Sequence, residues 1–209
     1  MIKNIVFDFG GVLVDWDPHY LYDAYFGDRA RADWFLTNVC PFSWHTRMDA
    51  GEPVAACLAE RKALFPEWSA EIQVYYDRWL EMIRGQIPGM EALIRSLRER
   101  GYRILGLSNW SAELFRITRP HFPVFDLIEG MVISGEERLV KPDEAIFRLL
   151  LERFSIRPEE TLFIDDNPAN VAAARRLGLH AIQFQGVESL REELDLLLSD
   201  PGAGSPITF

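Results

Sequence analysis

The sequence contains no long hydrophobic run. None of its apolar segments approaches the ~18 consecutive residues that a membrane-spanning helix requires. The N-terminal stretch MIKNIVFDF leads directly into a strand-like segment, with no apolar h-region before a small-residue cleavage site. These two absences predict a cytoplasmic protein with no membrane partner.

Cysteine is also scarce. Cys40 and Cys57 are the only two among 209 residues, and their spacing matches no metal-binding pattern. We therefore expect two reduced thiols and no disulfide framework, which is consistent with a cytoplasmic location.

Basic residues are outnumbered by acidic ones. The chain has 22 Lys and Arg against 32 Asp and Glu, a net charge of −10. This balance argues against a nucleic-acid partner, because such a surface needs basic patches. An anionic substrate would need local attraction, from a metal ion or a few placed cations.

Five short apolar segments alternate with amphipathic segments in residues 3–15 and from residue 88 onward. They mostly lack period-two alternation, as expected for strands buried on both faces. The intervening segments GMEALIRSLRERG, KPDEAIFRLLLERF and NPANVAAARRLG have helical spacing, and the last two carry a proline near the first turn. This order predicts an α/β fold with a Rossmann-like, mainly parallel five-stranded core. The predicted strands are NIVFDF, YRILGLS, LIEGMVIS, TLFIDD and HAIQF.

Residues 16–87 have a different composition. They are rich in aromatics, lack strand-like runs, and show helical spacing in DRARADWFLTNV, PVAACLAERKALF and EIQVYYDRWLEMI. We expect a helical cap domain here, inserted into a core domain made of residues 1–15 and 88–209. The final segment SDPGAGSPITF is small, polar and rich in Pro and Gly, and we expect a loosely held terminus.

Polar residues follow several of the predicted strands. In an open parallel sheet, ligands bind beyond the carboxyl ends of the strands, so these side chains are expected to share one crevice. A lysine opens the helical segment VKPDEA and joins the set. The candidates are Asp8, Ser108, Asn109, Lys141, Asp165 and Asp166.

Three carboxylates in one crevice repel one another unless a proton or a cation intervenes. Oxygen-only ligands of this type suit Mg²⁺. The ion and Lys141 would together neutralise a phosphate, which Ser108 and backbone N–H groups could bind. Asp8 would then be free to attack phosphorus as a carboxylate nucleophile.

The segments FDFGGVLVD, LSNW, KPDEAIF and FIDDNPANVAAARRLG resemble the four ordered motifs of the haloacid dehalogenase superfamily. The chain is most similar to the branch with a helical cap after the first motif, including sugar-1-phosphatase-like members. The resemblance covers residues 3–15 and 88–185. It implies Asp8 as nucleophile, Lys141 as the charge-balancing lysine, and phosphate binding by Ser108 and Asn109. It implies Mg²⁺ ligands from Asp8, Asp166, the carbonyl of Gly10 and, as an assisting group, Asp165.

Gly10 departs from the family pattern. Most phosphatases of the family have a second aspartate there, which protonates the leaving oxygen. Three interpretations stay open. The protein is an Mg²⁺-dependent phosphohydrolase for a small phosphorylated metabolite that needs little acid help, or that receives a proton from His45 or Asp15. Alternatively, it is a 2-haloacid dehalogenase, a branch that works without metal. Or it is an inactive phosphometabolite-binding protein.

The cap segment PFSWHTRMDAGEPV contains further candidates for substrate contact, namely Trp44, His45 and Arg47. Packing for Trp44 and solvent exposure for the other two are equally compatible with the sequence. Trp110, after the second motif, could line the entrance or pack under the cap. Both a monomer and a homodimer remain open.

Overall fold

The computed structural model describes residues 1–198, and the predicted C-terminal tail at 199–209 lies outside the described residues. Within residues 1–198, no helix is long and apolar enough to cross a membrane. Cys40 and Cys57 are both buried and free.

Five parallel strands form one sheet in the order β5-β4-β1-β6-β7. All five predicted strands are confirmed. The central strand β1 pairs with β4 on one side and with β6 on the other, so the carboxyl ends of these three strands lie together. The strands are β1 (Asn4–Phe7), β4 (Arg103–Ser108), β5 (Gly130–Ile133), β6 (Thr161–Asp165) and β7 (His180–Gln183).

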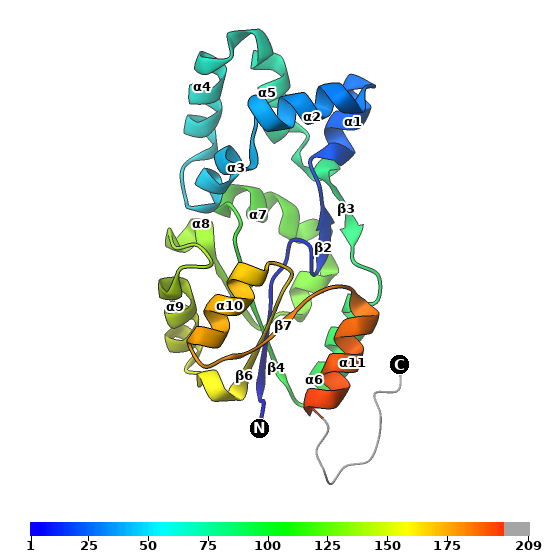
Figure 1. The fold of residues 1–209 in the computed structure, drawn as a ribbon, viewed down its shortest axis with the longest axis vertical. Coiled ribbons are helices and arrows are strands. Elements are labelled where there is room, and N and C mark those ends of the chain that lie inside the picture. Colours follow the sequence, from blue (N-terminus) through cyan, green and yellow to red (C-terminus); the bar gives the residue numbers. More distant parts are fainter. Residues whose placement is uncertain (199–209) are drawn as a thin grey trace.

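Helices cover both faces of the sheet (Figure 1). Successive side chains of a strand point to opposite faces, so Ile5 and Phe7 join one buried cluster and Val6 joins the other. The first cluster includes residues of α6 (Met90–Glu99) and α11 (Val187–Leu198). The second includes residues of α9 (Glu144–Phe154) and α10 (Pro168–Arg176).

A separate helical group lies beyond the carboxyl ends of the strands (Figure 1). A two-stranded antiparallel ribbon, β2 (Val14–Trp16) and β3 (Ile83–Gln86), connects it to the sheet. We call this group the cap. Its helices are α1 (His19–Phe26), α2 (Arg29–Asn38), α3 (Phe42–Asp49), α4 (Val54–Leu64) and α5 (Ser69–Asp77).

One sequence-based expectation in this region is wrong. Residues 16–87 were expected to lack strands, and the helical spacing of 71–83 was expected to continue to its end. Instead α5 ends at Asp77, a 3₁₀ turn spans Trp79–Met82, and β3 follows. The apolar spacing continues through the turn because Trp79 and Met82 are buried there, and the Trp79 ring packs against His45 of α3 and Tyr75 of α5.

Hydrogen bonds join the cap to the sheet domain at three separate places. The indole N–H of Trp79 donates to Oγ1 of Thr118 in α7 (Ala112–Thr118), at 2.8 Å. The N–H of Val54 donates to Glu113 at 3.0 Å. Ser134, which begins α8 (Ser134–Glu137), donates its hydroxyl to the carbonyl of Asp49 at 2.6 Å. The structure therefore has the cap docked against the sheet domain.

Candidate active site

Asp8 stands immediately after the central strand. Its N–H donates to the carbonyl of Ile164 on β6 at 2.9 Å, which continues the pairing one residue beyond β1. Its carboxylate Oδ1 accepts from the N–H of Phe9 at 2.7 Å, and the residue is only 7% exposed. A charged side chain is thus held at the buried end of an apolar strand.

Lys141 bridges two carboxylates. Its ammonium lies 2.9 Å from Asp8 Oδ1 and 2.6 Å from Asp165 Oδ2, and it also donates to the carbonyl of Leu107 at 3.0 Å. Burial raises the pKa of Asp8 to about 7, an effect that Lys141 opposes and Asp165 reinforces. The pKa of Lys141 is raised despite its burial, because both carboxylates favour the charged ammonium.

The Asp165 carboxylate accepts hydrogen bonds from three different residues. Besides Lys141, its oxygens accept from the N–H of Asn167 at 2.8 Å and from the side-chain amide of Asn170 at 3.0 and 3.1 Å. Asp166 is different, because it is exposed and lines a cavity. Partial burial and the neighbouring Asp165 raise its pKa.

The carboxylates of Asp8, Asp165 and Asp166 offer oxygen atoms within 4.8 Å of one another. Lys141 is one positive charge beside three carboxyl groups, so the cluster has a net negative charge when all three are ionised. Hard oxygen donors with excess negative charge fit Mg²⁺. The loop after β1 leaves room for this cluster, since a Cβ on Gly11 would lie 2.7 Å from Oδ2 of Asp166.

Asn109 holds the backbone of the lysine. Its side-chain amide donates to the carbonyl of Lys141 at 2.9 Å and its oxygen accepts from the N–H of Lys141 at 2.8 Å. Both side-chain groups of Asn109 are therefore already paired. Ser108 ends β4 and is 1% exposed, and it is not among the residues that line the cavity.

The cavity between cap and sheet has a volume of about 470 Å³, within the usual range for small-molecule sites. It brings together Asp8, Gly10, Asn109, Lys141 and Asp166 from the predicted core set, with His45 and Trp110 from the other candidates. The remaining lining residues were not predicted as site residues: Gly11, Trp16, Phe42, Thr46, Asp49, Trp79, Asn167 and Asn170.

His45 packs against two tryptophan rings, which also contact each other. It stacks on Trp16 with ring centroids 5.0 Å apart and on Trp79 at 5.8 Å. Its Nδ1 lies 2.9 Å from the hydroxyl of Tyr75, and its Nε2 lies 3.4 Å from Oδ2 of Asp49. The four-residue spacing of His45 and Asp49 puts both on one face of α3, a signal that the sequence already contained.

Two cap candidates lie outside the lining of this cavity. Trp44 is 3% exposed and donates its indole N–H to the carbonyl of Cys57 at 3.2 Å. Arg47 forms ion pairs with Glu52 at 2.6 Å and Glu60 at 2.5 Å. All three contacts are with other cap residues.

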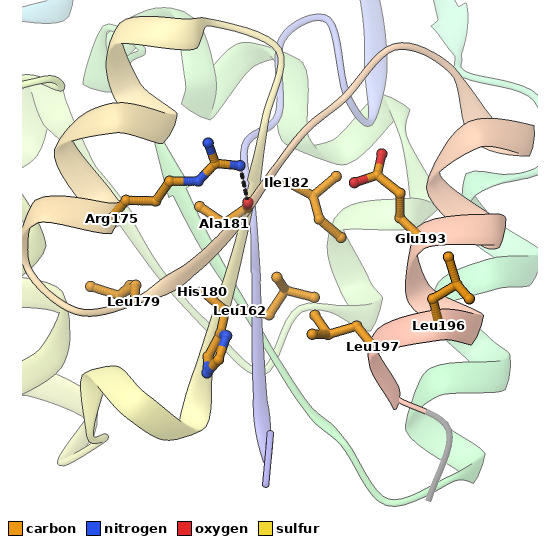
Figure 2. Close-up of a pocket in the computed structure, with 9 residues that line it drawn as sticks. All are labelled: Leu162, Arg175, Leu179, His180, Ala181, Ile182, Glu193, Leu196 and Leu197. Atoms are coloured by element: carbon orange, nitrogen blue, oxygen red, sulfur yellow. Dashed lines mark hydrogen bonds between the residues drawn. The ribbon is translucent and has the colours of Figure 1, made fainter.

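A second cavity, of about 530 Å³, lies beside the edge strand β7 and α11 (Figure 2). Its lining is mostly apolar, and Arg175 donates to the carbonyl of Ala181 there at 2.7 Å. Asp8, Lys141 and Asp166 are not among the residues that line this second cavity. The candidate catalytic and metal-binding residues therefore line the 470 Å³ cavity between cap and sheet.

Comparison with known proteins gives concordant results. The haloacid dehalogenase-like hydrolase family matches residues 2–178. D-ribitol-5-phosphate phosphatase of Bacteroides thetaiotaomicron is 28% identical over 208 residues, which cover 95% of this chain and 100% of that protein. Acyl-CoA dehydrogenase family member 10 of Mus musculus is 35% identical over 126 residues, 58% of this chain. The match spans only 11% of that longer protein.

A solved structure described as a predicted HAD-like family hydrolase, from Porphyromonas gingivalis, superimposes with a TM-score of 0.75. It is 26% identical, and the alignment covers 96% of this chain and 99% of that one. The family match extends over the whole sheet domain up to α10 and over the cap. The chain therefore belongs to the haloacid dehalogenase-like hydrolases.

Proposed function

We propose that this hydrolase is an Mg²⁺-dependent phosphohydrolase that acts on a small phosphorylated metabolite. The observation that carries the proposal is the buried Asp8–Lys141 contact of 2.9 Å, placed beside the Asp166 carboxylate in one cavity. A nucleophile, a fixed positive charge and a metal-binding carboxylate are the three groups that phosphoryl transfer to an aspartate requires.

Mg²⁺ would be held by Asp8, Asp166 and the backbone carbonyl of Gly10, with Asp165 oriented behind them by its own hydrogen bonds. When bound, the ion supplies positive charge against the phosphate and so offsets the negative charge of the protein. The donor chemistry of this cluster supports that assignment, since only hard oxygen ligands are present.

Asp8, Lys141 and Asn109 have different roles in the proposed reaction. An oxygen of Asp8 attacks phosphorus, and the bond from phosphorus to the ester oxygen breaks. Lys141 neutralises charge on the transferred group while Asn109 fixes the lysine backbone. Water then attacks the aspartyl-phosphate, which releases inorganic phosphate and regenerates the Asp8 carboxylate.

The leaving oxygen receives no proton from residue 10, which is glycine. Of the two substitutes considered from the sequence, Asp15 accepts hydrogen bonds from Tyr20 and is not among the cavity-lining residues. His45 lines the cavity. Its nitrogens already face Tyr75 and Asp49. These contacts favour a substrate whose leaving group needs little acid assistance.

The test is phosphate release from an aryl phosphate with and without a chelator. We expect release that needs Mg²⁺ and that falls about 10⁴-fold or more in Asp8→Asn, as when a catalytic nucleophile is removed. Asp28→Asn is the matched control, because Asp28 caps α2 in the cap and asparagine caps a helix equally well.

The alternatives give other results. A 2-haloacid dehalogenase would release halide from 2-chloropropionate in the presence of chelator. An inactive binding protein would release neither product, yet phosphate with Mg²⁺ would raise its melting temperature. Either result would refute the phosphohydrolase proposal.

A further inference from the structure

Phe42 is a large apolar side chain that is exposed beside the candidate active site. It begins α3 of the cap and is 66% exposed. Single exposed apolar residues are common on protein surfaces and indicate nothing by themselves. Phe42, however, lines the 470 Å³ cavity together with the partly buried Trp16, and the two ring centroids are 6.4 Å apart. We call these two residues the aromatic wall.

A third cavity, of about 270 Å³, adjoins the aromatic wall inside the cap. Trp16, Phe42 and His45 line both this cavity and the active-site cavity. An aromatic ring fits into such a space, since an apolar cavity of ~150 Å³ accommodates benzene. The aromatic wall therefore borders room for a ring-sized group next to the cavity that contains Asp8. The other residues that line the third cavity are Pro18, His19, Asp33, Leu36, Thr37, Cys40 and Tyr75.

The polar cap residues that line the active-site cavity have little to offer a substrate. Thr46 already donates its hydroxyl to the carbonyl of Ser43 at 3.0 Å. His45 and Asp49 are only 7% and 4% exposed. Among the described residues that line this cavity, Lys141 is the only Lys or Arg. A leaving group that carries its own negative charge, or many hydroxyl groups, would therefore find few partners on the cap side.

The missing acid restricts the leaving group independently. Residue 10 is glycine, Asp15 does not line the cavity, and both nitrogens of His45 face other side chains. Without a proton donor the leaving oxygen departs as an anion, so its own acidity determines how easily the bond to phosphorus breaks. A phenol has a pKa of about 10, as in tyrosine, and an alkanol is a much weaker acid. A phenolate therefore leaves without help far more readily than an alkoxide.

We propose that the substrate is an aryl phosphate monoester whose ring lies on the aromatic wall while its phosphate faces Asp8. This inference rests on the proposed phosphohydrolase function and specifies its substrate class. Asp8 attacks phosphorus and the bond from phosphorus to the phenolic oxygen breaks. The phenolate leaves with the electron pair of that bond and takes a proton from water.

The test compares phenyl, benzyl and cyclohexylmethyl phosphate with Mg²⁺ present. Benzyl and cyclohexylmethyl esters both release an alkanol, so their ratio of kcat/KM reports recognition of the aromatic ring. We expect a ratio of about 3 to 10, the size of one aromatic contact. The phenyl-to-benzyl ratio reports the leaving group, and we expect about 100 or more, because the alkoxide receives no acid assistance.

Replacement of Phe42 tests the aromatic wall directly. Phe42→Ala and Phe42→Leu should each lower the benzyl-to-cyclohexylmethyl ratio roughly 3-fold, since the ring contact is lost in both. Phe42→Tyr keeps the ring and should keep the ratio. Trp34→Ala is the matched control, because Trp34 is an aromatic cap residue, 49% exposed, that lines neither cavity. Melting temperatures show that each variant is folded.

A second measurement does not depend on turnover. Phenylphosphonate and methylphosphonate have a carbon–phosphorus bond in place of the ester, and calorimetry with Mg²⁺ measures their binding. We expect phenylphosphonate to bind about 10-fold more tightly, as for partial burial of an aromatic ring. Phe42→Ala should remove most of that difference, whereas Trp34→Ala should leave it unchanged.

The outcomes separate the two proposals. If no phosphate ester is hydrolysed with Mg²⁺, the proposed function fails and the substrate class fails with it. If the esters are hydrolysed but benzyl phosphate has no advantage over cyclohexylmethyl phosphate, the proposed function stands and the aromatic wall is refuted. An advantage that is unchanged in Phe42→Ala also refutes it. Faster turnover of phosphocholine, whose cation can also bind aromatic rings, than of phenyl phosphate would refute the aryl class.

Discussion

The ammonium of Lys141 lies 2.9 Å from the carboxylate of Asp8, and both residues are buried. The desolvation cost of burying two charges is offset only when they are paired and their other hydrogen bonds are satisfied. Lys141 meets this condition through Asp165 and the Leu107 carbonyl. Stability and chemistry therefore depend on the same ion pair.

Removal of the lysine charge should destabilise the protein. Lys141→Met would leave Asp8 and Asp165 facing each other without a counter-charge, and we expect the free energy of unfolding to fall by about 3–5 kcal/mol at pH 8. Urea unfolding measures this. The loss should be smaller at pH 5, where the raised pKa of Asp8 keeps it protonated.

Lys3→Met is the control for that experiment. Lys3 pairs with Glu160 at 2.8 Å, but its side chain is 61% exposed, so the change should cost less than about 1 kcal/mol. Equal losses for the two variants would contradict the assignment of a special role to the buried pair.

Magnesium affinity should depend on pH. The pKa of Asp8 is raised to about 7 by burial, so a proton occupies the carboxylate below that pH and must leave before a metal binds. We expect the association constant for Mg²⁺ to rise about tenfold per pH unit below pH 7 and to level off above it. Calorimetric titration from pH 5.5 to 8.5 tests this, and a flat profile would argue against Asp8 as a ligand.

Gly11 should be required for the metal cluster. Its φ is +75°, and a Cβ there would meet Asp166 Oδ2 at 2.7 Å. Gly11→Ala should therefore weaken Mg²⁺ binding by displacing this carboxylate. Gly27→Ala isolates the backbone effect, because Gly27 has a φ of +62° with no atom within 4 Å of its added Cβ. Both changes should cost about 1–2 kcal/mol of stability, but a loss of Mg²⁺ affinity in Gly27→Ala as well would disprove the steric explanation.

Gly10 offers a gain-of-function test. A Cβ at this position meets nothing within 4 Å, so a larger side chain has room. Gly10→Asp would supply the missing acid, and we expect kcat for a primary alkyl phosphate to rise about 100-fold relative to an aryl phosphate, at the lower end of the range of general acid catalysis. Gly10→Asn has the same shape without a proton to give. If the two variants behave alike, acid assistance does not limit the reaction.

Much of the sheet domain was predictable because its signals are local. A strand buried on both faces is an uninterrupted apolar run, and helix ends have their own markers. Asn167 caps α10 as its position before Pro168 suggests, and Gly178 follows the helix with a φ of +84°. The order of strands along the chain also places Asp8 and Asp165 at the same edge, whatever the details of packing.

The cap was less predictable, since its local signals are ambiguous. Strand β3 has four residues and pairs with β2 across a long insertion, and no local period encodes that pairing. Trp44 and Trp16 are both aromatic residues of the segment 16–87. Yet one donates to Cys57 inside the cap, and the other has an unpaired indole N–H and lines the cavity. Tertiary packing alone makes this difference.

The sequence by itself determined the parallel sheet and the acidic residues at its carboxyl edge, because apolar runs and chain order decide both. Only the tertiary structure decided which cap side chains face those residues. Asp49 and Trp110 come from distant segments, and Ser134 hydrogen-bonds to the backbone of both. Contacts of this kind depend on how the cap docks on the sheet domain, which no local pattern in the chain encodes.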